Sequence, residues 1–335
     1  MRETARAAAS SLLVLAVGVL LLLALPRLLD LHALINATIF ASLAILALSL
    51  AFVWGFAGIL SFGQAAFFGM GGYTYAVAGI NLGDTTGAIA LGILVPALFA
   101  ALLGYFMFWG RISDVYLGVI TLTVSLILFR LLNGTAGDAW RIGDAPLGGF
   151  NGIPQTPGIN WPGRPGEALT PDGVFYLAMA LVLLVYFGCR ALLASRFGRV
   201  MVAIRENERR AELLGYDARR YKLGAFAIGG GIAGLAGILF ANCVFVSPTM
   251  FSLNYSAQII IWVIVGGVGT LLGPLAGCVL VQLVTTSLGS AGWLNANLML
   301  GLILIGFVVL APSGLAPLPV TAARSLRRLF PGARA

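Results

Sequence analysis

Two glycine-rich stretches have the spacing of nucleotide-binding loops. "GGGIAG" (229–234) matches the dinucleotide pattern G-x-G-x-x-G, and "GGVGTLLG" (266–273) resembles a phosphate-binding loop. The first pattern requires a preceding strand and an acidic residue about 20 positions later, and the second requires a lysine. No Asp or Glu follows residue 234, and the second stretch has no lysine. We therefore expect close helix packing through Gly230 and Gly234 and no nucleotide site.

Residues that hold metal ions are sparse in this chain. Cys189, Cys243 and Cys278 lie in apolar runs at no metal-ligand spacing, and His32 is the only histidine. Buried cysteines of this kind behave as small hydrophobic side chains. We expect this chain to bind no metal and no cofactor.

Polar side chains within one glycine-rich apolar stretch, "GILSFGQAAFFGMGGYTYA" (58–76), are the main candidates for contact with a solute. The amide of Gln64 needs hydrogen-bonding partners inside a membrane. A neighbouring helix or a transported solute can supply them, and the hydroxyls of "GVITLTVSLILF" (118–129) can bond to their own helix. The residues expected to border a solute path are Ser61, Gly63, Gln64, Phe67, Thr121, Gly266, Gly267 and Gly269.

Charge is concentrated between Arg196 and Lys222. These 27 residues carry eight cations and four anions, 12 of the 32 charged side chains in the chain. Ile204, Ala211 and Leu214 recur at helical spacing and predict one apolar stripe on a charged helix. A partner protein explains this stripe better than a solvated loop does.

Local signals divide this region into two short helices at an angle. Gly215 suits the position just after a helix, and Asp217 suits the N-cap of the next helix. Glu206 can pair with Arg210 four residues later. The pattern also resembles a helix-turn-helix, but a connection between two spans lacks a core to hold one, so we expect no nucleic-acid binding.

The elements that position these residues are apolar helices. The chain has 335 residues, of which 60% are hydrophobic and 10% are charged, and its mean hydropathy is +0.99. Apolar runs of about 20 residues are long enough to cross a bilayer. The sequence predicts an all-α polytopic membrane protein with ten spans, although nine or eight remain open. The predicted spans are 11–29, 33–53, 59–80, 88–109, 111–132, 173–194, 223–246, 257–272, 274–290 and 293–311.

The distribution of cations predicts the orientation. With ten spans and both termini in the cytoplasm, 16 of the 20 Lys and Arg residues fall on the inner side, as the positive-inside rule requires. The net charge of +8 therefore points to a cytoplasmic bias of cations. We expect one transmembrane domain over residues 1–335, with an external loop at about 133–172 and a cytoplasmic loop at about 195–222.

The predicted spans contain no deep Asp or Glu. Carriers driven by protons or sodium usually need such groups for coupling. The energy for any transport is therefore expected to come from elsewhere.

Three stretches resemble LivM-type permeases, which are subunits of bacterial ABC importers for branched-chain amino acids. They are "GRVMVAIRENERRAELLGYDARRYKLGAFAIGGGIAGLAGILFA" (198–241), "LSFGQAAFFGMGGYTYA" (60–76) and "IIWVIVGGVGTLLGPLAG" (260–277). Permeases for urea and short amides share these motifs. Where the family often has a Thr-Gly-Gly-type outer loop, this chain has "PLGGFNGIP" (146–154).

The resemblance implies a permease in the bacterial inner membrane that works with four other components. These are a second, similar permease, two cytoplasmic ATPase subunits that use ATP, and an external solute-binding protein. The charged loop would be the coupling helix that docks into an ATPase subunit. The residues assigned to it are Ile204, Arg205, Glu206, Asn207, Glu208, Ala211, Leu214 and Gly215. The alternatives are an ion-coupled carrier and a membrane scaffold without a transport role.

Overall fold

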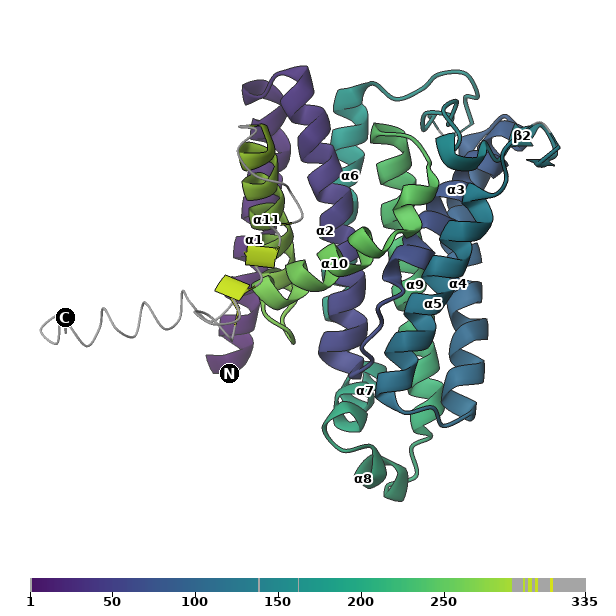
Figure 1. The fold of residues 1–335 in the computed structure, drawn as a ribbon. Helices are drawn as coiled ribbons and strands as arrows, with labels where there is room; N and C mark the ends of the chain where they lie inside the picture. The colour runs from purple at the N-terminus through teal and green to yellow at the C-terminus, as the bar shows by residue number, and fades with distance from the viewer. Residues whose placement is uncertain are drawn as a thin grey trace, which may run out of the picture.

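The fold is a bundle of long helices (Figure 1). It is seen in a computed structural model that describes residues 2–137, 139–161 and 163–290 and positions 298, 301, 302, 305, 306, 314 and 315. The long helices are α1 (Arg2–Leu28), α2 (Leu31–Ala57), α3 (Gln64–Leu82), α4 (Thr85–Trp109), α5 (Asp114–Asn133), α6 (Pro171–Ala194) and α9 (Ala218–Cys243). The shorter helices are α7 (Arg196–Glu206), α8 (Glu208–Leu213), α10 (Leu253–Gly266) and α11 (Leu272–Ser290). The all-α class is confirmed.

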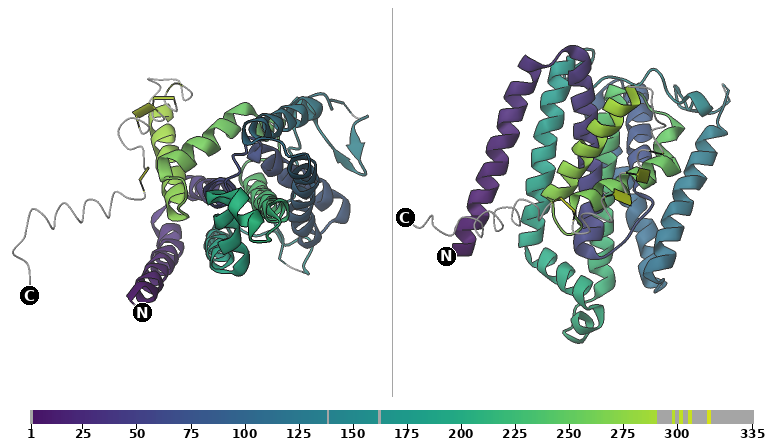
Figure 2. Two further views of the ribbon diagram at one scale, coloured as in Figure 1. Left: turned by 90° about the horizontal axis from the view of Figure 1, so that it is seen from below. Right: turned by 60° about the vertical axis from the view of Figure 1, so that its left-hand side comes forward.

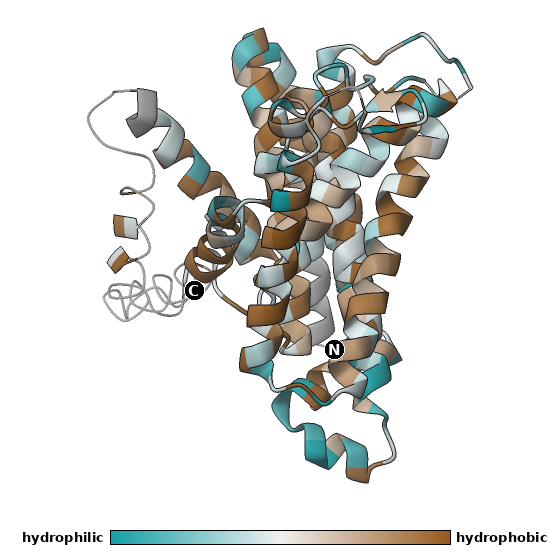
Figure 3. Ribbon diagram, turned by 45° about the vertical axis from the view of Figure 1, so that its right-hand side comes forward, coloured by the Kyte–Doolittle hydropathy of each residue, from teal (hydrophilic) through white to brown (hydrophobic). Residues whose placement is uncertain are grey.

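The centre of the bundle is formed by α2 and α9. In the apolar 18-residue segment of each helix, 78% of α2 and 72% of α9 is buried, whereas only 6% of the corresponding segment of α1 is buried. Helix α1 stands at the edge of the bundle and contacts α6, as both views in Figure 2 show. Hydrophobic residues cover the lengths of the helices, and polar residues gather at the two ends of the bundle (Figure 3).

Glycines allow α9 to approach α4 closely. A Cβ atom at Gly230 would lie 2.6 Å from the Cβ atom of Ala100, and one at Gly234 would lie 2.6 Å from the carbonyl oxygen of Gly92. Real Cβ contacts are almost never this short. The prediction that "GGGIAG" serves helix packing is therefore confirmed, and the stretch lies within a helix and not in a phosphate-binding loop.

The predicted count of ten spans is not confirmed. Within the described residues, six helices are long and apolar enough to cross a membrane, namely α1, α2, α4, α5, α6 and α9. Helix α10 has 14 residues and is therefore about 21 Å long, against a hydrocarbon core of about 30 Å. It runs obliquely across the bundle in Figure 1. The predicted span 293–311 lies almost wholly outside the described residues.

The predicted span 59–80 also begins later than expected. Gly58 adopts a left-handed conformation with φ of 74° and ends α2, and its amide donates to the carbonyl oxygens of Trp54 and Val53. Residues 58–63 are irregular, and α3 begins at Gln64. A residue in this conformation stops a helix, and glycine adopts it without steric cost.

In the predicted loop at 133–172, the described residues between Asn133 and Pro171 form no α-helix. Its regular parts are a hairpin of β1 (Arg141–Ile142) and β2 (Ala145–Pro146) and the turn η1 (Gly149–Asn151), and a second such turn, η2 (Pro248–Phe251), precedes α10. This loop lies at the opposite end of the bundle from α7 and α8 (Figure 1).

Hydrogen bonds of three asparagines hold this loop against the ends of helices. The carboxamide oxygen of Asn81 accepts from the amide of Asp144 at 2.8 Å, and that of Asn242 accepts from the amide of Ile159 at 2.8 Å. The carboxamide nitrogen of Asn160 donates to Asp84 at 2.9 Å. That bond, together with the amide of Thr86, lowers the pKa of the Asp84 carboxyl. The loop is therefore an ordered cover over one end of the bundle.

Candidate functional site

The charged segment, residues 195–222, forms a compact unit at the lower end of the bundle in Figure 1. Ser195 caps α7 by accepting from the amide of Gly198 at 3.3 Å. Asn207 then interrupts the helix and caps α8 by accepting from the amide of Arg210 at 2.9 Å. The segment thus contains two short helices, α7 and α8, but their break at Asn207 was not predicted, and the second helix predicted to start after Gly215 is the beginning of the long helix α9.

The turn from α8 into α9 also follows the prediction. Gly215 has a φ of +89°, which is the left-handed conformation expected just after a helix. Asp217 caps α9 by accepting from the amide of Arg219 at 3.2 Å. Because only the dihedral angle restricts Gly215, and no atom lies within 4 Å of its Cβ position, the glycine is needed for the path of the backbone.

The single apolar stripe is not present. Ile204 and Ala211 are 2% and 3% exposed and pack with Ala218 in a small interior cluster, whereas Leu214 is 73% exposed. The break at Asn207 folds α8 back on α7, so that two residues of the predicted stripe face the chain's own interior. The predicted pair between Glu206 and Arg210 is absent among the described ion pairs, and Glu206 instead lies 3.7 Å from Arg205.

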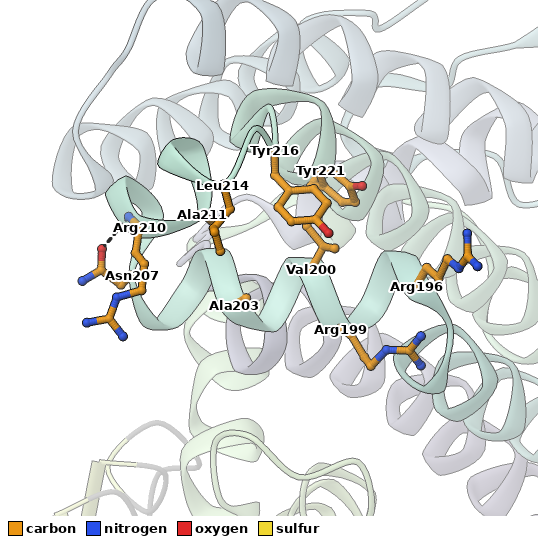
Figure 4. A pocket seen from close by; sticks show the side chains of 10 residues that line it. All are labelled: Arg196, Arg199, Val200, Ala203, Asn207, Arg210, Ala211, Leu214, Tyr216 and Tyr221. Atoms are coloured by element: carbon orange, nitrogen blue, oxygen red, sulfur yellow. Dashed lines mark hydrogen bonds between the residues drawn. The ribbon is translucent and has the colours of Figure 1, made fainter.

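The folded charged segment forms one open groove with a volume of about 690 Å³ (Figure 4). Val200 and Ala203 contribute its apolar part from α7, and Leu214 contributes from the turn after α8. Tyr216 and Tyr221 meet edge to face, with ring centroids 6.1 Å apart. The cations along the groove are Arg196, Arg199 and Arg210.

Arg205 connects the charged segment to the bundle. Its guanidinium donates to the carbonyl oxygen of Gly55 in the last turn of α2. A Cβ atom at Gly58 would lie 3.0 Å from the Cγ atom of Arg205, and a Cβ atom at Gly269 would lie 3.7 Å from its Nη1 atom. The end of α2, the end of α7 and the α10–α11 turn therefore meet at Arg205.

The irregular stretch that follows Gly58 leads to the predicted solute residues. The amide of Phe62 donates to the hydroxyl of Thr121 at 3.2 Å, and a Cβ atom at Gly63 would lie 2.4 Å from the carbonyl oxygen of Thr121. The hydroxyl of Ser61 accepts from the amide of Gly63 at 3.3 Å. The structure thus brings Ser61, Gly63 and Thr121 together with the first residue of α3, Gln64.

Gln64 is 1% exposed, and neither its amide nitrogen nor its amide oxygen has a hydrogen-bonding partner among the described residues. A Cβ atom at Gly229 in α9 would lie 3.6 Å from the Gln64 nitrogen. Phe67, one turn later, lies with its ring centroid 5.4 Å from that of Phe226 and 6.3 Å from that of Phe99. Phe67 therefore packs in an aromatic cluster among α3, α4 and α9.

The three glycines of the later stretch occupy a different place. Gly267 and Gly269 have φ of 107° and 87° in the turn between α10 and α11. A Cβ atom at Gly266 would lie 2.2 Å from the carbonyl carbon of Gly273, so the two helices meet almost backbone to backbone. Gly269 lies beside Gly55 and Arg205, which groups this turn with the charged segment.

Several residues of interest were not predicted from the sequence. The side chain of Arg205 packs against Gly58 and donates to the carbonyl oxygen of Gly55. In the sequence, only the spacing of the two glycines in "WGFAG" (54–58) indicates an unusual backbone conformation at this position. Within the part of the chain that the structure describes, other buried polar groups without a partner are Tyr73 Oη, Ser125 Oγ, Ser256 Oγ and Trp262 Nε1. Burying a polar atom without a partner costs free energy, so these atoms mark positions inside the bundle where further hydrogen bonds can form.

Comparison with known proteins adds independent information. Residues 33–311 match the family model described as "Branched-chain amino acid transport system / permease component". No solved structure gives a significant match.

Two bacterial relatives are described as "High-affinity branched-chain amino acid transport system permease protein LivM". The protein of Salmonella typhimurium is 31% identical over 299 residues, which is 82% of this chain and 67% of the relative. The protein of Escherichia coli is 30% identical over 307 residues, which is 84% of this chain and 69% of the relative. The "Autoinducer 2 import system permease protein LsrC" of Enterobacter sp. is 31% identical over 147 residues, covering 41% of this chain and 43% of the relative.

Proposed function

The chain belongs to the family of permease components of branched-chain amino acid transport systems, and from this we propose that it is the membrane-spanning subunit of an ATP-driven importer. Its solute is a branched-chain amino acid or a related small polar molecule. ATP is hydrolysed by two separate cytoplasmic subunits, a second permease completes the path, and an external binding protein delivers the solute. The subunit resides in the inner membrane of a bacterium.

The observation that carries this proposal is the connection from the charged segment to Gln64. Arg205 contacts the last turn of α2 and Gly58, and the irregular residues that follow Gly58 lead directly to Ser61 and Gln64. A movement of α7 against α2 therefore acts on the stretch where a buried amide lacks partners. Such a connection is what an importer needs between its energy source and its solute path.

The orientation in the proposal rests on the cation distribution and on the opposite positions of the two loops. It places the charged segment and both termini in the cytoplasm and residues 133–172 outside. Labelling of intact cells with a membrane-impermeant thiol reagent tests it, using Arg209→Cys and Gly158→Cys. The reagent should modify the cysteine at 158 alone, and modification of the cysteine at 209 alone would reverse the orientation.

The solute is tested by uptake of radiolabelled leucine with the binding protein present. Competition by unlabelled isoleucine and valine should lower this uptake, whereas urea or acetamide should leave it unchanged. The relatives that import autoinducer 2 show that one permease scaffold serves different solutes, so each solute class is measured separately. Uptake of urea without uptake of leucine would reassign this permease to urea or short amides.

A further inference from the structure

We infer that the groove of the charged segment is a socket for an acidic segment of the ATPase subunit. This inference rests on the proposed function, because it assumes an ATPase partner. It adds the chemistry of the contact: the permease receives a carboxylate-bearing segment in its own groove, in addition to presenting an exposed helix.

The ion pairs of this segment lie outside the groove. Glu208 pairs with Lys222 at 2.6 Å, Asp217 pairs with Arg220 at 3.1 Å, and Glu206 lies 3.7 Å from Arg205. None of these cations lines the groove. Three of the four carboxylates in the segment are therefore held by cations elsewhere.

The cations that line the groove lack such partners. Arg196 and Arg210 form no ion pair with any carboxylate of the described residues, and Arg199 donates to the carbonyl oxygen of Ala194 at 2.7 Å. No Asp or Glu of the described residues lines the groove. Figure 4 shows Arg196 and Arg199 towards one end of α7 and Arg210 towards the other. An acidic occupant would supply these exposed arginines with the carboxylate partners that they lack within the described residues.

The apolar part of the groove favours a protein over a lipid. Val200 and Ala203 lie between the cations, and Leu214, which also lines the groove, is 73% exposed. Helix α8 is the element farthest from the membrane-crossing parts of the helices (Figure 1). In the proposed orientation this end of the molecule lies in the cytoplasm, where a protein partner is available. Apolar side chains flanked by complementary charge are typical of a specific protein interface.

The test compares two double variants that remove the same charge. Arg196→Gln with Arg210→Gln neutralises the groove, and Arg209→Gln with Arg219→Gln neutralises two cations of the same segment that do not line it. The measured quantity is the amount of ATPase subunit that co-purifies with tagged permease in detergent at 50 and 500 mM NaCl. We expect the groove variant to retain at least tenfold less ATPase at low salt, with the control within twofold of wild type.

Salt and charge retention show whether the effect is electrostatic. High salt should lower ATPase retention by wild type and by the control, but should change the groove variant little. Arg196→Lys with Arg210→Lys should restore most of the retention, which excludes misfolding as the cause. Equal retention by the groove and control variants would overturn the socket while leaving the proposed function intact.

Two further outcomes would also contradict the socket. If wild-type permease retains no ATPase, the proposed function itself fails. If the groove variant keeps its ATPase but loses bound phosphatidylglycerol, measured by native mass spectrometry, the groove belongs to an anionic lipid and the inference is wrong.

Discussion

The guanidinium of Arg205 donates a hydrogen bond to the carbonyl oxygen of Gly55, 150 residues earlier in the chain. The last carbonyls of a helix lack intrahelical donors, and a cation at this end also complements the helix dipole. Gly55 lies against Gly269 as well, because a Cβ atom at Gly55 would be 2.9 Å from the Gly269 amide nitrogen. One side chain of the charged segment therefore joins the segment to α2 and to the α10–α11 turn.

Replacing Arg205 should separate ATPase binding from transport. Arg205→Gln removes a charged donor whose hydrogen bond contributes about 1.5–3 kcal/mol, and about 1.4 kcal/mol corresponds to a tenfold change. We expect solute-stimulated ATP hydrolysis in vesicles to fall about tenfold, with ATPase co-purification unchanged. Arg209→Gln, an exposed neighbour in α8, is the control and should keep full stimulation. Equal stimulation in both variants would show that Arg205 does not transmit the movement.

Gln64 offers a test in which stability and function move in opposite directions. Both polar atoms of its buried amide lack partners, so Gln64→Leu should leave the melting temperature of the purified permease unchanged or raise it. Uptake should fall at least tenfold if the amide serves the solute. Thr123→Val is the control, because Thr123 is exposed and bonds only to Val119 of its own helix. Normal uptake kinetics in Gln64→Leu would remove this residue from the solute path.

The turn at Gly215 should tolerate only residues that accept positive φ. Gly215→Val places a β-branched residue at φ of +89° and should redirect α8, whereas Gly215→Asn should be tolerated. Because no span depends on this turn, we expect membrane insertion to survive in both variants. Solute-stimulated ATP hydrolysis should be lost only in the valine variant. Equal stimulation in the two variants would mean that the turn angle has no part in coupling.

The packing of α9 on α4 should limit the stability of the bundle. In Gly234→Ala the added methyl group would lie 2.6 Å from the carbonyl oxygen of Gly92, and relieving such overpacking costs about 1–3 kcal/mol. We expect a lower melting temperature in detergent and less purified protein. Gly188→Ala is the matched control, since no atom lies within 4 Å of its Cβ position. If both variants melt with the wild type, the helices are farther apart than described.

Structural features that depend on neighbouring residues were predictable from the sequence, whereas contacts between distant residues were not. Gly215, Asp217 and the close approach at Gly230 and Gly234 depend on dihedral preferences and small side chains, which residue types reveal. The fate of Ile204 depends on how α8 folds back, and helical spacing cannot distinguish a partner protein from the chain's own interior.

The contact of Arg205 with Gly55 joins positions far apart in the sequence, so no local pattern predicts it. The short length of α10 was not predictable for a related reason. Hydropathy shows that residues 257–272 are apolar, but it does not show that α10 has only 14 residues and crosses the bundle obliquely.

The central claim is that transport by this permease is driven by ATP through the charged segment. The most direct test is uptake of radiolabelled leucine into vesicles that contain the permease pair and its two ATPase subunits, with the binding protein outside and ATP or a non-hydrolysable analogue inside. We predict that wild type accumulates leucine only with ATP, that collapse of the ion gradients by ionophores has no effect, and that Arg205→Gln accumulates about tenfold less. Accumulation that persists without ATP and disappears with the ionophores would contradict this mechanism and identify an ion-coupled carrier.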